Sequence, residues 1–499
     1  RNRMKYRNPV IPGFHPDPSF CRVGEDYYLV TSSFEYFPGV PVYHSRDLVH
    51  WEQIGHALTR DSQLPLQNVG RSRGIYAPTI RYHNGRFYII TTNVDSIGNF
   101  IVTADHPAGP WSEPVLIDQP GIDPSLFFDD DGKVYYTGTH HDSSGVQGIG
   151  LFEIDPDTGA RREETRIVWY GTGWKCPEAP HLYKINGLYY LMIAEGGTEY
   201  GHMVTIARAS SPYGPYEACP GNPILTHASN RMRGSAIAGT GHADLLQAHD
   251  GSWWMVFLAF RPTEQYFHHL GRETFLCPVR WENGWPVVND GKPVRLEMDV
   301  PCLPSAPVSA PQGRELFSAG FSPQWNWLRN PARERYEISA EGLTLTGADV
   351  TIDMDKNPTW VGRRQEQFTV ECRTLLQPLA LPAGGRAGLT VFYDGEHHYD
   401  LALTDGKLQL RLLVGDICHI AFETPWEGAC ELEVRAERMK YEFFYGAPGK
   451  AKQFAGSAIT RHVSTEATRL GFTGVYLALF AEKGARALFP WFECAQREE

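Results

Sequence analysis

The hydrophobic positions of the chain gather in short runs that are typical of β-strands, and no long helical period interrupts them. Aromatic and β-branched residues fill the segments 27–31, 87–92 and 189–193, and Gly, Asn and Asp residues bound each segment. Such runs between turn formers indicate strands joined by tight connections. The 49 glycines and 36 prolines fit many connections of this kind. The sequence therefore predicts an all-β protein.

Five hairpin signals divide the first 300 residues into units of similar length. Four of them are Asn-Gly or Asp-Gly pairs, which are the strongest short-range hairpin signals, and all five precede an aromatic pair or near-pair. The turns start at positions 24, 84, 131, 186 and 250, so they are 47 to 64 residues apart. Five units of this size predict a five-bladed β-propeller. A β-sandwich with chance turns is the alternative.

The repeats end near residue 300, and a proline-rich segment follows. Residues 301–312 contain four prolines in twelve positions, which is typical of a stiff linker. Alternating apolar positions return beyond it, for example at 343–346 and 407–412. We therefore expect a propeller domain at 1–300, a linker at 301–312 and a β-sandwich domain of the jelly-roll or concanavalin-like type at 313–499.

Equivalent positions in the five units carry residues that can do chemistry. Asp123, Glu178, His242 and Tyr76 lie eight residues before the hairpin turns of their units, and Asp17 lies nine residues before the end of the first turn. The innermost strand of each propeller blade lines the central channel, so these side chains should converge. An Asp before a Pro, as at 17 and 123, is by itself most often a turn former. Three acids and a histidine in register favour a site.

Converging carboxylates have two common uses in proteins. They can hold a hard cation with their oxygen atoms, or they can act as the acid and base of glycoside hydrolysis. Phe34, Tyr36 and Phe37 lie in the loop after the first strand that we expect in blade one, near the expected channel mouth. Aromatic rings stack on the apolar faces of sugars, so Phe34 favours the glycosidase interpretation, although loop packing would also account for it.

The motifs that carry these residues resemble those of glycoside hydrolase family 43. The resemblance covers essentially the whole chain, and the order and spacing of the motifs are more specific than any one of them. The two-domain β-xylosidases are most similar, and many of them also release α-L-arabinofuranose. The matching segments include NPVIPGFHPDPS at 8–19, GIDPSLF at 121–127, PEAPHLY at 177–183 and LGRET at 270–274.

The resemblance implies an inverting reaction with three carboxylates. Asp17 would be the general base that activates water, Glu178 the general acid, and Asp123 the residue that orients this acid and tunes its pKa. Two roles at one pH need separated pKa values, and a neighbouring like charge raises the pKa of Glu178. The two catalytic carboxyl groups of an inverting enzyme are about 6.5–9.5 Å apart.

The resemblance also implies substrate-binding residues. Arg272 would bond a sugar hydroxyl while pairing with a carboxylate, unless it forms a structural ion pair with Glu273 or another acid. His242 would hold a water network or help to bind a Ca²⁺ ion, unless it is an ordinary core histidine. Tyr76 stands where several β-xylosidase relatives carry Trp. That difference leaves the preference between xylose and arabinose open.

The second domain is expected to narrow the mouth of the pocket. The segment 471–476 resembles a loop that leans over the propeller in relatives of this architecture, and Tyr476 is our candidate for an aromatic lid. Packing of Tyr476 inside the sandwich is the alternative. A narrow mouth suits an exo-acting enzyme that removes one sugar from a chain end. A carbohydrate-binding module would be a different use of the sandwich.

These observations lead to a hypothesis for the function. The chain is expected to release xylose from the non-reducing ends of β-1,4-xylo-oligosaccharides, with α-L-arabinofuranosidase activity and no required cofactor. A dedicated α-L-arabinofuranosidase acting on arabinoxylan fragments is the alternative enzyme. A non-catalytic sugar-binding propeller should lack at least one of the three acids, whereas all three are present.

Composition limits the partners and the compartment. Lys and Arg number 46 and Asp and Glu 58, so the net charge of −12 excludes a basic surface for nucleic acid. No apolar run of about 18 residues predicts a membrane span. The nine cysteines form no CxxC pair, which predicts free thiols. The first residues contain no apolar stretch of the signal-peptide type, so we expect a cytoplasmic protein. The resemblance leaves a homodimer or homotetramer open.

Overall fold

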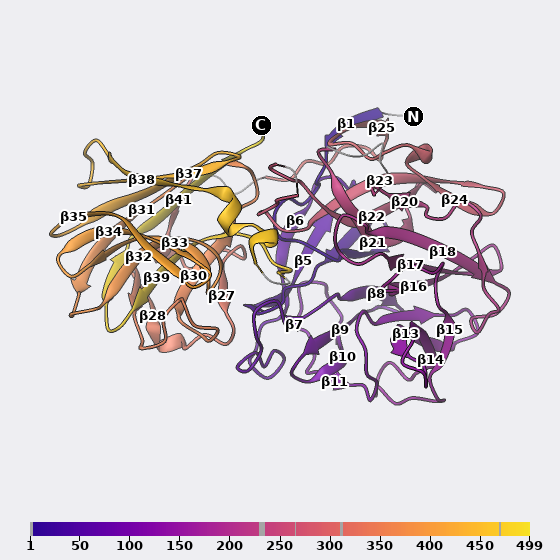
Figure 1. Ribbon diagram of the computed structural model, residues 1–499. Coiled ribbons are helices and arrows are strands. Elements are labelled where there is room, and N and C mark those ends of the chain that lie inside the picture. Colours follow the sequence, from indigo (N-terminus) through magenta and orange to yellow (C-terminus); the bar gives the residue numbers. More distant parts are fainter. Residues whose placement is uncertain (1–2, 229–234, 265, 310–312, 469–470) are drawn as a thin grey trace.

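Five antiparallel sheets follow one another along the first 288 residues of the computed structural model, and the sandwich lies beside them (Figure 1). The structure describes residues 3–228, 235–264, 266–309, 313–468 and 471–499. The prediction of a five-bladed propeller followed by a β-sandwich is confirmed. None of the helices in these ranges is long and apolar enough to cross a membrane.

Each blade consists of four or five strands, which follow one another from the channel outward. Blade one contains β2 (Ser19–Val23), β3 (Asp26–Val30), β5 (Gly39–Ser45) and β6 (Glu52–Leu58). Blade two contains β8 (Thr79–His83), β9 (Arg86–Val94), β10 (Gly98–Ala104) and β11 (Val115–Leu116), with β7 (Gly74–Ile75) beside β9. Blade three contains β12 (Ser125–Phe128), β13 (Val134–His141), β14 (Gln147–Glu153) and β15 (Arg166–Trp169).

The last two blades follow the same plan. Blade four contains β16 (Glu178–Ile185), β17 (Leu188–Glu195), β18 (Met203–Ala209), β19 (Glu217–Ala218) and β20 (Leu225–Thr226). Blade five contains β21 (Ala238–Gln247), β22 (Trp253–Phe260), β23 (Glu273–Glu282) and β24 (Trp285–Val288). At the N-terminus β1 (Arg3–Arg7) pairs with β25 (Glu297–Pro301), which follows blade five.

Local turn chemistry explains why each unit opens with a hairpin. Asn84 and Gly85 both have positive φ angles, of 50° and 81°, and Asn186 and Gly187 have 51° and 81°. Two consecutive residues with positive φ are what a two-residue turn of type I′ requires, and its twist matches that of the flanking strands. The turns therefore set the register between the first and second strands of these blades.

A buried polar layer joins all five blades inside the channel. Asp244 of β21 is fully buried and pairs with Arg81 of β8 at 2.9 Å, and the hydroxyl of Ser19 donates to the same carboxylate at 2.8 Å. Arg81 Nη2 and the hydroxyl of Ser125 both approach His181 Nδ1, at 3.2 and 3.0 Å. Each of these five residues comes from a different blade, so a single network fixes the innermost strands relative to one another.

Two large sheets form the C-terminal sandwich. One contains β26 (Arg314–Leu316), β28 (Tyr336–Ser339), β29 (Gly342–Thr346), β31 (Thr369–Ala380), β36 (Cys430–Ala436), β37 (Lys440–Gly446), β38 (Gln453–Ile459), β40 (Arg486–Phe489) and β41 (Trp491–Arg497). The other contains β27 (Asn326–Leu328), β30 (Thr359–Arg364), β32 (Arg386–Asp394), β33 (His397–Thr404), β34 (Lys407–Val414), β35 (Ile417–Pro425), β39 (Tyr476–Glu482) and one propeller strand. Of the predicted linker, residues 310–312 lie outside the described ranges, and 302–309 form neither strand nor helix.

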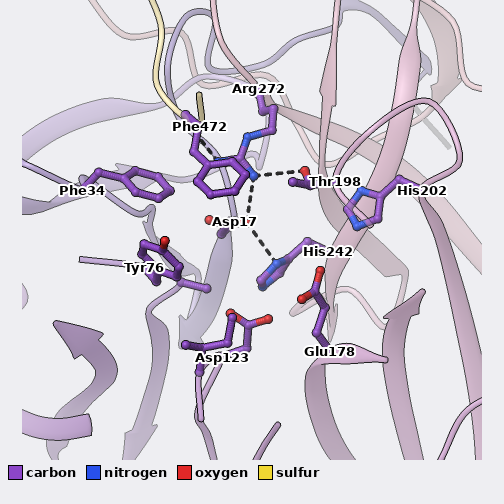
Figure 2. Close-up of a pocket in the computed structure, with 12 residues that line it drawn as sticks. Asp17, Phe34, Tyr76, Asp123, Glu178, Thr198, His202, His242, Arg272 and Phe472 are labelled. Atoms are coloured by element: carbon purple, nitrogen blue, oxygen red, sulfur yellow. Dashed lines mark hydrogen bonds and ion pairs between the residues drawn. The ribbon is translucent and has the colours of Figure 1, made fainter. Parts of the chain in front are cut away.

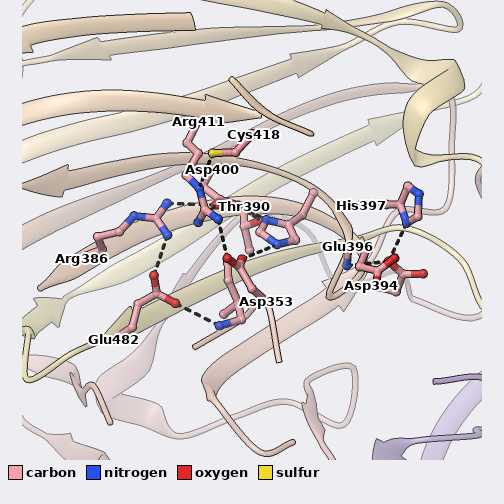
Figure 3. Close-up of polar contacts among 12 residues, drawn as sticks. Asp353, Arg386, Thr390, Asp394, Glu396, His397, Asp400, Arg411, Cys418 and Glu482 are labelled. Carbon is pink, nitrogen blue, oxygen red and sulfur yellow. Dashed lines mark hydrogen bonds and ion pairs between the residues drawn. The ribbon is translucent and has the colours of Figure 1, made fainter. Parts of the chain in front are cut away.

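A buried ionic network reinforces this second sheet (Figure 3). Arg386 of β32 pairs with Asp400 of β33 at 2.9 Å, and His398 Nδ1 lies 2.6 Å from the same carboxylate. Arg386 also contacts Glu482 of β39 at 2.5 Å. These side chains are buried, where an unpaired charge would be costly, and each is paired with a group of opposite charge. The network links the three neighbouring strands β33, β32 and β39.

The propeller strand in that second sheet ties the two domains together. It is β4 (Tyr36–Phe37), which leaves blade one and pairs with β27 at the edge of the sandwich. Tyr36 also stacks on Tyr476, with ring centroids 4.3 Å apart, and the guanidinium of Arg364 donates to the carbonyl of Phe14 at 2.7 Å. The contact is thus both a sheet extension and an aromatic core.

The polar layer predicts a large stability loss when its ion pair is broken. Replacing Arg81 by Met leaves the carboxylate of Asp244 buried without its cation, so we expect the free energy of unfolding to fall by about 3–5 kcal/mol. The matched control is Arg86→Met, because Arg86 pairs with the exposed Asp157, and we expect it to cost less than about 1 kcal/mol. Chemical denaturation followed by tryptophan fluorescence measures both, and equal losses would contradict the role of the layer.

Candidate active site

A cavity opens where the innermost strands begin, and twelve residues line it (Figure 2). Seven of the eight site residues expected from the sequence line it, namely Asp17, Phe34, Tyr76, Asp123, Glu178, His242 and Arg272. The sequence reasoning missed the other five residues of its wall, which are Ala77, Ile122, Thr198, His202 and Phe472. The pocket thus collects one or more side chains from every blade and one from the sandwich.

The backbone turns the acidic side chains into the cavity. Asp17 and Asp123 directly precede a Pro and an inner strand, and both have left-handed backbone, with φ of 56° and 58°. His242 also has a positive φ, of 49°, and so has Ala179, the residue after Glu178, with 57°. Left-handed backbone at a residue with a Cβ costs of order 1–3 kcal/mol and is concentrated at functional sites. Repetition of this conformation at equivalent positions of three blades, and one residue later in blade four, indicates a shared functional requirement.

Asp17 is held in its ionised form. His242 Nδ1 lies 3.0 Å and Arg272 Nη1 3.8 Å from Asp17 Oδ1, and the hydroxyl of Ser32 donates to Oδ2 at 2.7 Å. Burial raises the pKa of Asp17, but the positive charges of His242 and Arg272 outweigh it and hold this pKa below its usual range. The carboxylate is therefore charged at neutral pH and free to accept a proton.

Glu178 is held in the opposite state. The pKa of Glu178 is raised to about 8, mainly by burial and secondly by the negative charge of Asp123. Burial also raises the pKa of Asp123, to about 6. Asp123 Oδ2 accepts a hydrogen bond of 3.0 Å from the backbone N–H of Ala179, so it fixes the segment that carries Glu178. At neutral pH the pocket therefore holds Glu178 protonated and Asp17 ionised, with different tasks.

Arg272 faces the cavity rather than its sequence neighbour. Its guanidinium donates to Thr198 Oγ1 at 3.1 Å and to the carbonyl of Phe472 at 3.0 Å. Glu273 instead pairs with Arg261 at 2.7 Å, so the alternative of an Arg272–Glu273 ion pair is wrong. The guanidinium connects the sandwich segment, blade four and the carboxylate of Asp17.

His242 is held in its charged form. Although burial lowers the pKa of His242, the nearby charge of Asp17 raises it to about 9. Within the described ranges no group of three or more His, Cys, Asp and Glu side chains could hold a metal ion. His242 therefore serves as the charged partner of Asp17.

Three aromatic rings form one wall of the pocket. The ring centroid of Phe34 lies 5.1 Å from that of Tyr76 and 5.9 Å from that of Phe472, and Tyr76 and Phe472 are 6.1 Å apart. Figure 2 shows Phe34 and Tyr76 across the cavity from Glu178. Such a wall offers apolar faces opposite a polar set of carboxylates and a guanidinium, which suits a ligand with one apolar face and many hydroxyls.

The expectation that Tyr476 forms the lid is wrong. Tyr476 is fully buried, its ring stacks on Tyr36, and its hydroxyl donates to Asn326 Oδ1 at 2.9 Å. Phe472, four residues earlier in the same segment, lines the pocket instead. Tyr476 begins strand β39, so its side chain belongs to the sheet, whereas Phe472 lies in the preceding loop and reaches the propeller.

Comparison with known proteins gives consistent results for both parts of the chain. The family described as glycosyl hydrolases family 43 matches residues 6–286, and the beta-xylosidase C-terminal concanavalin A-like domain matches residues 315–495. The chain is 41% identical to a non-reducing end α-L-arabinofuranosidase of Bacteroides ovatus, over 98% of this chain and 94% of that protein.

Two further similar proteins have names that include xylosidase activity. A xylosidase/arabinosidase of Butyrivibrio fibrisolvens is 42% identical over 82% of each chain. The crystal structure of a xylan β-1,4-xylosidase from Bacillus halodurans superposes with a TM-score of 0.93 at 34% identity, over 98% of this chain and all of that one.

The electrostatic coupling in the pocket predicts how Glu178 titrates. Replacing Asp123 by Asn removes the second cause of the raised pKa, so we expect the pKa of Glu178 to fall below about 8 while staying above its ordinary value. NMR titration of ¹³C-labelled glutamate carboxyls measures it, with Glu178→Gln to assign the signal. Asp130→Asn, at an exposed surface position, is the control. An unchanged pKa in Asp123→Asn would show that the two carboxyls are not coupled.

Proposed function

Because the chain belongs to glycosyl hydrolase family 43, we propose that it is an exo-acting, inverting glycosidase that releases xylose from the non-reducing ends of β-1,4-xylo-oligosaccharides, with α-L-arabinofuranosidase activity in the same pocket. The chain is a glycoside hydrolase. The observation that carries the proposal is the pair of carboxyl groups with opposite protonation, Asp17 ionised and Glu178 protonated, in a pocket with an aromatic wall.

The two carboxyl groups divide the proton transfers of the reaction. Asp17 accepts a proton from a water molecule as the water oxygen bonds to the anomeric carbon of the sugar. Glu178 donates its proton to the glycosidic oxygen as the bond between that oxygen and the anomeric carbon breaks. Attack on the face opposite the leaving group inverts the configuration. Proton exchange with solvent then restores the ionised Asp17 and the protonated Glu178.

The remaining polar residues prepare this division. His242 and Arg272 keep Asp17 ionised before the water arrives, and Asp123 acts as a positioning residue for Glu178 through the N–H of Ala179. Arg272 also lines the pocket, where a hydroxyl of the terminal sugar can accept a hydrogen bond from its guanidinium. Asp123 carries no proton transfer in this scheme.

The closed shape of the pocket supports attack at a chain end. Phe472 comes from the sandwich, and its backbone N–H donates to Ser72 Oγ at 2.9 Å. The carbonyl of Ser72 accepts from the hydroxyl of Tyr76 at 3.0 Å, and the N–H of Ser72 donates to the buried carboxyl of Glu35 at 3.1 Å. One residue thus ties two aromatic rings and both domains together. A pocket narrowed in this way by a residue of the sandwich suits a single terminal sugar rather than the middle of a chain.

A dedicated α-L-arabinofuranosidase is the second candidate. A relative with 41% identity over nearly the whole chain carries that name. Tyr76 supports it as well, because a phenol offers less stacking area than an indole and adds a hydroxyl, which is held in place by Ser72 and Arg73. The relative rates on xylosides and arabinofuranosides distinguish the two enzymes.

Side-by-side hydrolysis assays test the proposal. We expect the wild type to hydrolyse xylobiose, 4-nitrophenyl β-D-xylopyranoside and 4-nitrophenyl α-L-arabinofuranoside. Glu178→Ala should lower kcat on xylobiose by about 10²–10⁴-fold, since the leaving sugar then departs without its proton. Glu113→Ala, at an exposed surface position, should match the wild type. Hydrolysis of the arabinofuranoside alone would favour the second candidate, and sugar binding without turnover would contradict both.

The pH profile of the wild type follows from the two protonation states. Glu178 must keep its proton, so kcat/KM should decline as the pH rises through about 8. Asp17 must be ionised, and since its pKa is depressed, the loss on the acidic side should come only below the ordinary range of an Asp carboxyl. Initial rates on xylobiose in a series of buffers measure both limbs. A decline that begins near pH 5 on the basic side would overturn the assignment of Glu178.

A further inference from the structure

An exposed tryptophan lies in the loop that leads into the general acid. Trp174 is four residues before Glu178, and 60% of its surface is exposed. Within the described ranges its ring stacks on no other aromatic ring and belongs to no apolar cluster. The exposed indole offers a large, rigid apolar face on which a sugar ring can stack.

A buried carboxylate fastens this loop from below. Glu195, at the end of β17, is fully buried and accepts hydrogen bonds from the backbone N–H of Thr172 at 2.9 Å and of Trp174 at 3.2 Å. The hydroxyls of Thr172 and Thr205 donate to it at 2.9 and 2.6 Å. A Cβ on Gly171 would lie 2.7 Å from its Oε1, so the loop packs directly on the carboxylate. The loop is pre-organised rather than free to move.

The same loop contacts a turn that borders the pocket. The carbonyl of Lys175 accepts from the N–H of Gly196 at 2.8 Å, and the ammonium of Lys175 pairs with Glu199 at 2.7 Å. Between these two contacts lies Thr198, which lines the cavity and binds Arg272. The rim beside Glu178 therefore consists of the Trp174 loop and the turn that follows β17.

The chemistry of the reaction identifies what lies beside this rim. A general acid must stand next to the oxygen of the leaving group, so the leaving part of the substrate extends past Glu178. The aromatic rings of Phe34 and Tyr76, which are suited to the sugar that is released, lie across the cavity (Figure 2). The rim next to Glu178 is thus the side on which the rest of the oligosaccharide leaves the pocket.

We propose that Trp174 is the stacking platform for the first sugar of the leaving group, a pyranose ring whose C–H face lies on the indole. Glu195 is the positioning residue that holds this platform through the backbone of Trp174 and the side chain of Thr172. The inference rests on the proposed function and adds a binding subsite beyond the cleaved bond. It makes the loop at 171–176 the part of the chain that distinguishes oligosaccharides from glycosides with small leaving groups.

The test compares two substrates that share the released sugar. Xylobiose has a pyranose as its leaving group, whereas β-D-xylopyranosyl fluoride has none, and fluoride departs without help from a sugar subsite. We expect Trp174→Ala to lower kcat/KM on xylobiose by about tenfold, mainly through KM, and to leave the fluoride within about twofold of the wild type. Trp174→Phe should keep most of the activity on xylobiose, because it retains an aromatic face.

Two further variants separate the platform from general effects. Phe454→Ala removes a comparably exposed ring, 53% accessible, from strand β38 of the sandwich, and it should leave both substrates unaffected. Glu195→Ala should lower kcat/KM on xylobiose selectively, because it removes both oxygen atoms that accept the N–H groups of the loop. Because Trp174 is exposed, its own variants should fold even where Glu195→Ala does not.

The outcomes also separate this inference from the proposed function. Equal losses on both substrates in Trp174→Ala, or no loss on either, would overturn the subsite while leaving the glycosidase assignment intact. A wild type that hydrolyses neither substrate would overturn the proposed function, and the subsite with it. A selective loss on xylobiose, retained in part by Trp174→Phe, supports the platform.

Discussion

The ion pair between Arg81 and Asp244 at the centre of the propeller is the interaction on which the active site depends. Residues from all five blades meet at this pair, and Ser19, Ser125 and Asp244 each lie two positions after a residue of the pocket. Any shift of one inner strand would therefore displace a catalytic side chain and disturb the polar layer together. A buried pair is a weak source of stability compared with apolar packing. Its hydrogen bonds, however, fix direction, which apolar contacts do not.

Charge balance then explains why two similar carboxyl groups take opposite roles. The pocket contains three acids, Asp17, Asp123 and Glu178, and two cations, Arg272 and the protonated His242. Both cations lie against Asp17, so its charge is matched and its pKa falls. Glu178 is left with burial and the repulsion of Asp123, which favour its neutral form. The proposed acid and base thus follow from where the cations are placed, not from the difference between Asp and Glu.

The sandwich contributes to the active site as a structural element of the pocket. It extends its sheet onto β4 of the propeller, clamps the loop around Ser72, and supplies Phe472 to the aromatic wall. The wall is therefore complete only when the two domains are docked. The shared sheet and the aromatic cluster between the domains hold the segment that carries Phe472 against the propeller.

The sequence by itself determined the features that repeat. Asn-Gly and Asp-Gly turns set the hairpins, and their spacing brought Asp17, Asp123, Glu178 and His242 into register, because the distance from a turn to the channel end of a strand is a local property.

The tertiary structure decided what depends on loops and on docking. A turn signal cannot say that Phe472 rather than Tyr476 reaches the propeller, since this depends on where a sandwich strand begins relative to another domain. Nor could spacing show that Arg81 and Asp244 meet or that Glu195 holds the loop of Trp174, because such partners are distant in the chain and only packing brings them together.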